Sequence, residues 1–116
     1  MDAQLGSRLI LETGSDTVEY GPLAASAGQV LHLGTAPGND VVAGNQHASR
    51  HHAHIEVRRS SYYLVDASTN GTFVQTDDEQ ISYVHRDALR LWGGGWISLG
   101  EPLHVGVPIR FNETSK

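Results

Sequence analysis

The sequence contains no cysteine, which excludes disulfides and thiolate metal sites. No window approaches the ~20 apolar residues of a membrane-spanning helix, and residues 1–7 lack the basic start and apolar stretch of a signal peptide. Positive charge is scarce, since 8 Lys and Arg side chains stand against 13 Asp and Glu, a formal net charge of −5. Proteins that bind duplex nucleic acid normally present a basic face. These absences favour a soluble cytoplasmic protein that binds neither membranes nor nucleic acid.

The 116 residues fit one domain, because domains commonly run to ~100–150 residues. The 13 glycines and 4 prolines are spread along the chain, with short apolar or alternating runs between them, a pattern typical of short strands joined by turns. In the clearest alternation, Ala53 and Ile55 face a core while His52 and His54 face the polar side. No helical stripe outlasts the breakers around it.

Eleven segments are predicted to be strands, and they are 8–11, 17–20, 29–33, 40–42, 52–57, 62–65, 71–74, 81–84, 89–91, 96–99 and 108–111. So many short strands indicate an all-β sandwich or barrel. We expect a single domain over 8–111, with flexible ends at 1–7 and 112–116.

Three segments rich in short hydrogen-bonding side chains lie at strand ends or in loops: 34–40, 49–53 and 66–72. Their order and spacing resemble the forkhead-associated (FHA) family, which has a Gly-Arg turn before Asn-Asp, then Ser-Arg-x-His-Ala, then Ser-x-Asn-Gly-Thr. The resemblance covers roughly 31–100. It implies an FHA-like β-sandwich of about eleven short, mostly antiparallel strands, with recognition loops at one end. It also implies a module that binds phosphothreonine peptides and is not an enzyme.

The residues at these positions suit that ligand. A phosphothreonine carries ~1.5–2 negative charges and three acceptor oxygens, so it needs converging donors on loops held by a rigid scaffold. By the resemblance, Ser49 and Thr69 contact the phosphate, Arg50 adds a phosphate or peptide contact, and Asn70 holds the peptide main chain. The positions that the resemblance makes structural are Gly34, His52 and Gly71.

One position departs from the family pattern. Thr35 stands where the family has the arginine that is a principal phosphate ligand. A hydrogen bond to a charged group contributes about 1.5–3 kcal/mol, so its loss weakens binding roughly tenfold to a hundredfold. Thr35 keeps a hydroxyl but no charge, and Arg50, helped by His47 or His51 when protonated, is the available replacement. We therefore predict a weakened phosphothreonine reader.

A second departure is the run from Trp92 to Trp96, which replaces the usual Gly-Asp turn. The region 83–100 resembles FHA modules attached to bacterial nucleotide cyclases, which implies a regulatory module. The predicted partner is a phosphothreonine-containing protein or segment, including one on the parent chain. The alternative is a phospho-independent interaction or dimerisation module, with the aromatic turn as its contact surface.

Two other kinds of chemistry fit the residues less well. The four histidines between His47 and His54 suggest zinc, but His51 points away from the strand face that His52 and His54 share, and no third ligand is evident. Ser49, a histidine and Asp66 lack the Gly-x-Ser-x-Gly elbow of a hydrolase. The sequence therefore predicts no metal, no cofactor and no catalytic residue.

Overall fold

The computed structural model describes residues 6–14 and 16–114. Over these residues the chain forms eleven strands and the short 3₁₀ segment η2 (Leu23–Ala25), and all eleven predicted strands are confirmed. The strands are β1 (Arg8–Glu12), β2 (Thr17–Tyr20), β3 (Val30–Gly34), β4 (Val41–Val42), β5 (Ala53–Arg58), β6 (Ser61–Asp66), β7 (Thr72–Thr76), β8 (Ile81–Val84), β9 (Ala88–Leu91), β10 (Gly94–Leu99) and β11 (Ile109–Thr114). Among the described residues, no helix has the length and apolar character to cross a membrane.

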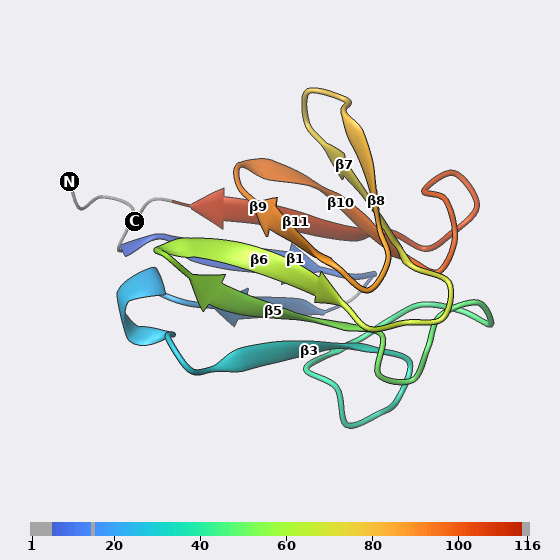
Figure 1. The fold of residues 1–116 in the computed structure, drawn as a ribbon, viewed down its shortest axis with the longest axis horizontal. Coiled ribbons are helices and arrows are strands. Elements are labelled where there is room, and N and C mark those ends of the chain that lie inside the picture. The colour runs from blue at the N-terminus through green and yellow to red at the C-terminus, as the bar shows by residue number, and fades with distance from the viewer. Residues whose placement is uncertain (1–5, 15, 115–116) are drawn as a thin grey trace.

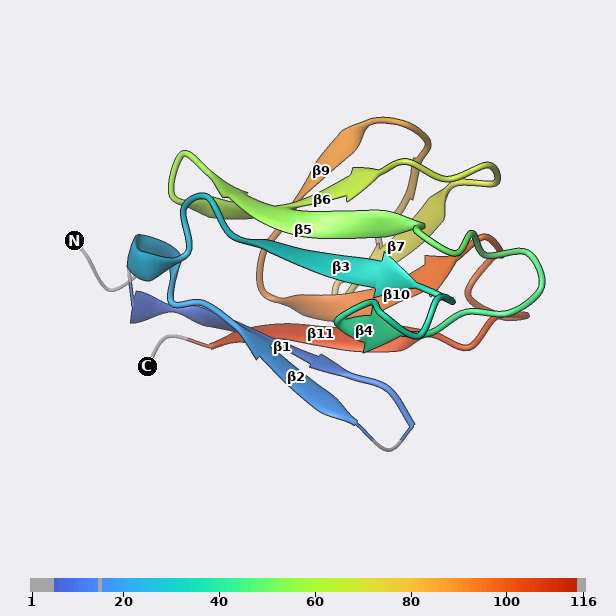
Figure 2. The same cartoon turned by 90° about the horizontal axis from the view of Figure 1, so that it is seen from below.

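The strands form two facing sheets, seen edge-on in Figure 1 and from below in Figure 2. One sheet has the order β2-β1-β11-β10-β7-β8 and the other β4-β3-β5-β6-β9. Every pairing is antiparallel except that of β3 with β4. The predicted FHA-like β-sandwich is therefore confirmed.

The core lies between the sheets, where apolar side chains alternate inward from both layers. Ile55 from β5, Leu64 from β6 and Phe111 from β11 have no exposed surface. Each such side chain stabilises the fold by about 1.5–3 kcal/mol through burial. His52 departs from the prediction, because it is fully buried and not on the polar face. It precedes β5, so strand alternation does not govern its direction.

The edges of the domain lie further out than predicted. β11 continues to Thr114, which pairs with Arg8 of β1. On the other side Ser7 is buried, its hydroxyl donates to Glu113 (2.7 Å) and its carbonyl accepts the Tyr62 hydroxyl (2.8 Å). Residues 112–114, which were expected to belong to a flexible end, lie in a strand paired with β1. Residues 1–5 and 115–116 lie outside the described residues.

The predicted aromatic turn is mostly strand. Only Trp92 and Gly93 separate β9 from β10. Gly95 is in β10, where a Cβ atom would overlap the carbonyl oxygen of Gln75. This glycine therefore reflects close approach between strands. Trp92 and Trp96 are 52% and 40% exposed.

The loops after β3, β4, β6 and β10 gather at one end of the sandwich, on the right in Figure 1. The β5–β6 turn and η2 lie at the opposite end. All three motif segments thus meet at one end, on rigid strands from both sheets.

Candidate functional site

The loop after β3 is bound through its main chain to the loop before β5. Thr35 N donates to the Ser49 carbonyl and Ala36 N to the Arg50 carbonyl, each at 3.2 Å. A Cβ atom on Gly34 would overlap the same Arg50 carbonyl oxygen. Only glycine allows the two loops to come this close.

Asn39, a residue of the first motif that was not among the predicted site residues, completes this junction. Its buried side-chain amide donates to the carbonyls of Ala36 (3.0 Å) and Arg50 (2.7 Å). A buried amide with both bonds satisfied is a strong local anchor. The motif Asn thus holds the loop in shape, and the sequence signal for this role was its place in the motif.

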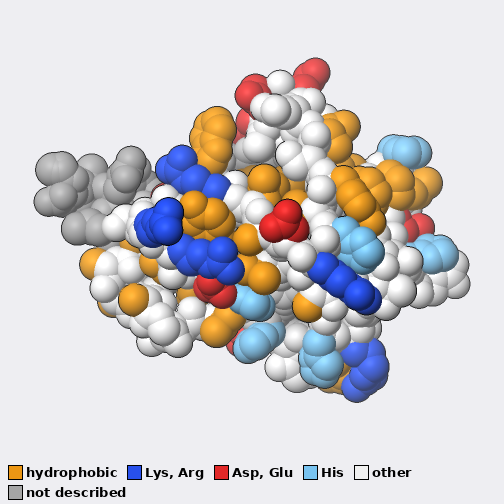
Figure 3. Space-filling view, in the orientation of Figure 1, with side chains coloured by type: hydrophobic (Ala, Val, Ile, Leu, Met, Phe, Trp, Pro, Cys, Tyr) orange, Lys and Arg blue, Asp and Glu red, His pale blue; other side chains and the backbone are white. Residues whose placement is uncertain are grey.

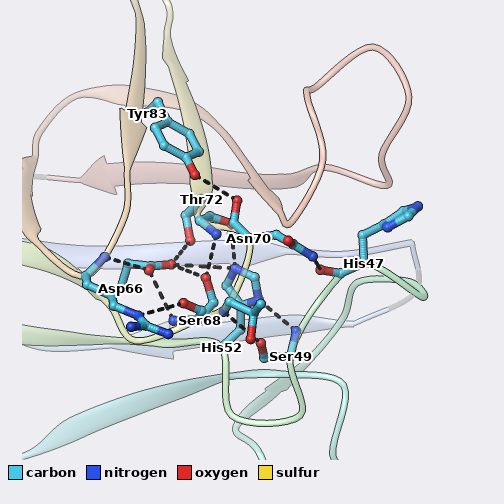
Figure 4. Close-up of polar contacts among 11 residues, drawn as sticks. His47, Ser49, His52, Asp66, Ser68, Asn70, Thr72 and Tyr83 are labelled. Carbon is cyan, nitrogen blue, oxygen red and sulfur yellow. Dashed lines mark hydrogen bonds and ion pairs between the residues drawn. The ribbon is translucent and has the colours of Figure 1, made fainter.

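His52 connects the loop before β5 to the loop between β6 and β7, as Figure 4 shows. Its Nδ1 accepts the Ser49 N–H (2.9 Å), and Nε2 lies 2.8 Å from the Gly71 carbonyl. Since Nδ1 accepts, the neutral ring carries its proton on Nε2 and donates it to Gly71. Burial lowers the pKa of His52, outweighing the opposite effects of the Gly71 carbonyl and the Asp66 carboxylate. The ring is therefore a neutral structural brace.

Asp66, the last residue of β6, holds the loop between β6 and β7 through its buried carboxylate. Its carboxylate accepts four hydrogen bonds, from Ser68 N (3.1 Å), Ser68 Oγ (2.8 Å), Thr72 Oγ1 (2.7 Å) and Arg86 N (2.9 Å). Burial by itself would raise the pKa of Asp66, but the bonds from Arg86, Thr72 and Ser68 hold it below its usual value. The buried carboxylate is thus charged and fixes the loop.

Ser49, Thr69 and Asn70 are brought together by these braces. Thr69 N donates to Ser49 Oγ at 3.3 Å. Asn70 Nδ2 donates to the His47 carbonyl at 2.9 Å, and the Asn70 carbonyl accepts the Tyr83 hydroxyl at 3.0 Å. Thr69 and Asn70 are exposed and Ser49 is half-buried. Residues from loops of both sheets therefore present hydroxyl and amide groups at one exposed place.

Gly71 closes this loop with φ of +85°, a left-handed conformation that glycine adopts readily. Its carbonyl accepts from Gly100 N (2.9 Å) as well as from the His52 ring. The sheets are thereby joined at the recognition end.

Two predicted site residues, Thr35 and Arg50, hold the loops through their main chains and not through their side chains. Thr35 is half-buried and Arg50 exposed, and neither side chain forms a hydrogen bond or ion pair within the described residues. His47 is 50% exposed at its side chain, with Nε2 3.8 Å from Glu101. In the part of the chain that the structure describes, no three His, Asp or Glu side chains are arranged to hold a metal ion.

Comparison with known proteins points to one family. The FHA domain model matches residues 31–100. No curated protein matches the sequence significantly.

Three solved structures illustrate the likeness in fold. The FHA-1 domain of Rv1747 from Mycobacterium tuberculosis is 16% identical with a TM-score of 0.69, over 93% of this chain and 97% of that chain. The N-terminal FHA domain of Rad53p from S. cerevisiae, in complex with a phosphothreonine peptide, is 22% identical with a TM-score of 0.65, over 95% and 93%. The FhaA FHA domain complexed with the intracellular domain of Rv3910 is 22% identical with a TM-score of 0.58, over 93% and 99%.

At these identities the structural likeness shows the fold, and the family assignment comes from the sequence match. The matched region includes all three loop motifs and the residues that join them. Because it spans more than half of the chain, this protein belongs to the FHA domain family.

Proposed function

We propose that the loop end of this domain binds a phosphothreonine segment of a partner protein or of its own parent chain. The observation that carries the proposal is the meeting of Ser49, Thr69 and Asn70 at one exposed place, held by His52. Ser49 Oγ accepts from Thr69 N, so its own proton remains available to a phosphate oxygen. The Thr69 hydroxyl supplies a second donor.

Asn70 is suited to hold the peptide main chain. One of its two amide hydrogens is used by the His47 carbonyl, which fixes the orientation of the side chain. The second hydrogen and the side-chain carbonyl can then engage a peptide N–H and C=O. Membership of a family of binding modules supports this assignment over an enzymatic one.

We further propose that phosphate binding is weakened because Thr35 brings no positive charge to the site. Thr35 N is bound to the Ser49 carbonyl, so the residue lies beside the phosphate-binding serine without bringing a charge. Arg50 follows that serine and is exposed, which makes it a second source of positive charge. A module of this kind, attached to a bacterial nucleotide cyclase, would be regulatory, and that attachment remains a prediction.

The test is a titration of a degenerate peptide library with a fixed phosphothreonine, and of its unphosphorylated twin, against the native domain, Thr35→Arg and Ser49→Ala. We expect the native domain to bind only phosphopeptides, Thr35→Arg to tighten them about tenfold or more, and Ser49→Ala to weaken them by a similar factor. Ala24→Arg is the charge control, because η2 lies at the opposite end. Equal affinity of the native domain for both libraries would refute the proposed function.

A second candidate is phospho-independent association through the outer face of the six-stranded sheet. Ile81 and Tyr83 of β8 and Trp96 of β10 are 61%, 54% and 40% exposed. Register places Ile81 and Trp96 on either side of Gln75, so they share one face. Sedimentation should show concentration-dependent association that Ile81→Ser removes, and a monomer at all concentrations would exclude dimerisation.

A further inference from the structure

A second arginine, outside the three loop motifs, is bonded to the loop between β6 and β7. Arg86 lies between β8 and β9, and its side-chain Nε donates to the Ser68 carbonyl at 3.3 Å. Its backbone N donates to the Asp66 carboxylate at 2.9 Å. Both contacts are to the segment that carries Thr69, so Arg86 is tied to the predicted phosphate contact by main chain and side chain alike.

The geometry of one peptide unit links Arg86 to Ser49. The Ser68 carbonyl, which accepts from Arg86, and the Thr69 N–H, which donates to Ser49 Oγ at 3.3 Å, belong to the same planar peptide. Arg86 Nε therefore lies within about 9 Å of Ser49 Oγ. The C=O and N–H of a trans peptide point in opposite directions, so Arg86 and Ser49 lie on opposite sides of this peptide unit, and a phosphate held by both must sit over its face. The two terminal guanidinium nitrogens lie beyond Nε and extend the reach of the side chain.

The backbone at Arg86 is held in an uncommon conformation. Its φ is +53°, in the left-handed region that few residues other than glycine adopt. The bond to the buried Asp66 carboxylate stabilises this conformation, and the same carboxylate accepts both bonds from Ser68. Arg86 and the recognition loop are thus placed by one buried group.

The part of the chain that the structure describes holds no carboxylate paired with the Arg86 guanidinium. The adjacent Asp87 bonds to Ala88 N, and Asp66 is buried behind the loop. On the face in Figure 3, positive side chains cluster at the end opposite the loops, while others stand apart nearer the loop end.

We propose that Arg86 supplies the guanidinium contact to phosphate that position 35 lacks. The inference rests on the proposed function and adds a residue from a loop that carries none of the three motifs. The positive charge at this site then comes from two arginines, Arg86 bonded to the β6–β7 loop and Arg50 in the loop before β5.

The experiment measures fluorescence anisotropy of a peptide pool with a fixed phosphothreonine, and of its unphosphorylated twin, against native protein, Arg86→Gln and Arg86→Lys. We expect Arg86→Gln to weaken phosphopeptide binding about tenfold or more. Arg86→Lys should recover part of that loss, because it restores the charge without the planar fork. The loss should shrink at high salt, as screening predicts.

Arg90→Gln is the matched control, because Arg90 is also exposed and its Nε also bonds to a serine oxygen, Ser61 Oγ at 3.1 Å. Urea midpoints of all variants confirm that they are folded. The inference would be overturned if the native protein prefers the phosphorylated pool and Arg86→Gln binds that pool as tightly as Arg90→Gln does. The proposed function would then still stand. Arg86→Lys as weak as Arg86→Gln, both folded, would also overturn it. Native protein that does not discriminate would refute both.

Discussion

Replacement of His52 by alanine should destabilise the whole domain, although His52 lies at the recognition end. The ring has no exposed surface and joins Ser49 N to the Gly71 carbonyl. Gly71 retains its second partner, Gly100 N, so its carbonyl stays satisfied. Ser49 N loses its acceptor.

The magnitude follows from these contacts. Two neutral hydrogen bonds contribute about 0.5–1.5 kcal/mol each, and a buried N–H left without a partner costs about 1–3 kcal/mol. The space left by the ring adds a cavity penalty. We therefore expect His52→Ala to lower the free energy of unfolding by about 3–5 kcal/mol, measured by urea denaturation at pH 7.

His54→Ala is the matched control, since His54 lies two residues away with its ring on the outer surface, paired with Glu56. A partly exposed pair of this kind contributes about 1 kcal/mol or less. If His52→Ala is no more destabilising than His54→Ala, the bracing role of the ring is refuted.

The same residue should make stability depend on pH. The folded pKa of His52 lies below the ordinary value of 6.5, so the unfolded chain binds a proton more readily than the folded one. Native stability must then fall as pH drops below about 6.5. The difference in unfolding free energy between native protein and His52→Ala should narrow between pH 7 and pH 5, and a constant difference would contradict this reasoning.

Three further substitutions test the contacts that hold the loops and the core. Asp66→Asn should lower the free energy of unfolding by about 2–4 kcal/mol at pH 7. The loss should be smaller at pH 3, because the lowered pKa of Asp66 gives stability above pH ~4 that acid removes. Urea midpoints of native protein and variant at both pH values measure the difference. Tyr62→Phe removes the bond to the Ser7 carbonyl and should cost about 1 kcal/mol; in native protein burial raises the pKa of Tyr62 to about 12, so spectrophotometric titration should show it ionising late. Gly34→Ala should cost about 3 kcal/mol or more by overlap with the Arg50 carbonyl, and an unchanged melting temperature would contradict that overlap.

Much of the fold could be predicted because strand alternation and turn residues are local signals. Segment 81–84 coincides with β8, and the inward direction of Ala53 and Ile55 follows from their period of two. The three motifs also located the recognition end, since each occupies a strand end. These features depend only on residues close in sequence.

Features that depend on distant residues were missed. The resemblance made His52 structural, but strand alternation placed its ring on the polar side. The ring is buried, with bonds to Ser49 in its own loop and to Gly71 in the β6–β7 loop. Nothing local marked Arg86 as a partner of Ser68, which is 18 positions away. Residues 112–114 looked like a loose end because their order comes from β1, at the other end of the sequence.

The junction between the first two recognition loops has a consequence for how this domain can change in evolution. At positions 35 and 50 the bonds that hold the loops use backbone atoms, Thr35 N and the Arg50 carbonyl, and leave both side chains out. A substitution at either position can therefore alter ligand affinity while the junction persists. Under the proposed function, single amino-acid changes at these positions would strengthen or weaken phosphate binding without unfolding the protein.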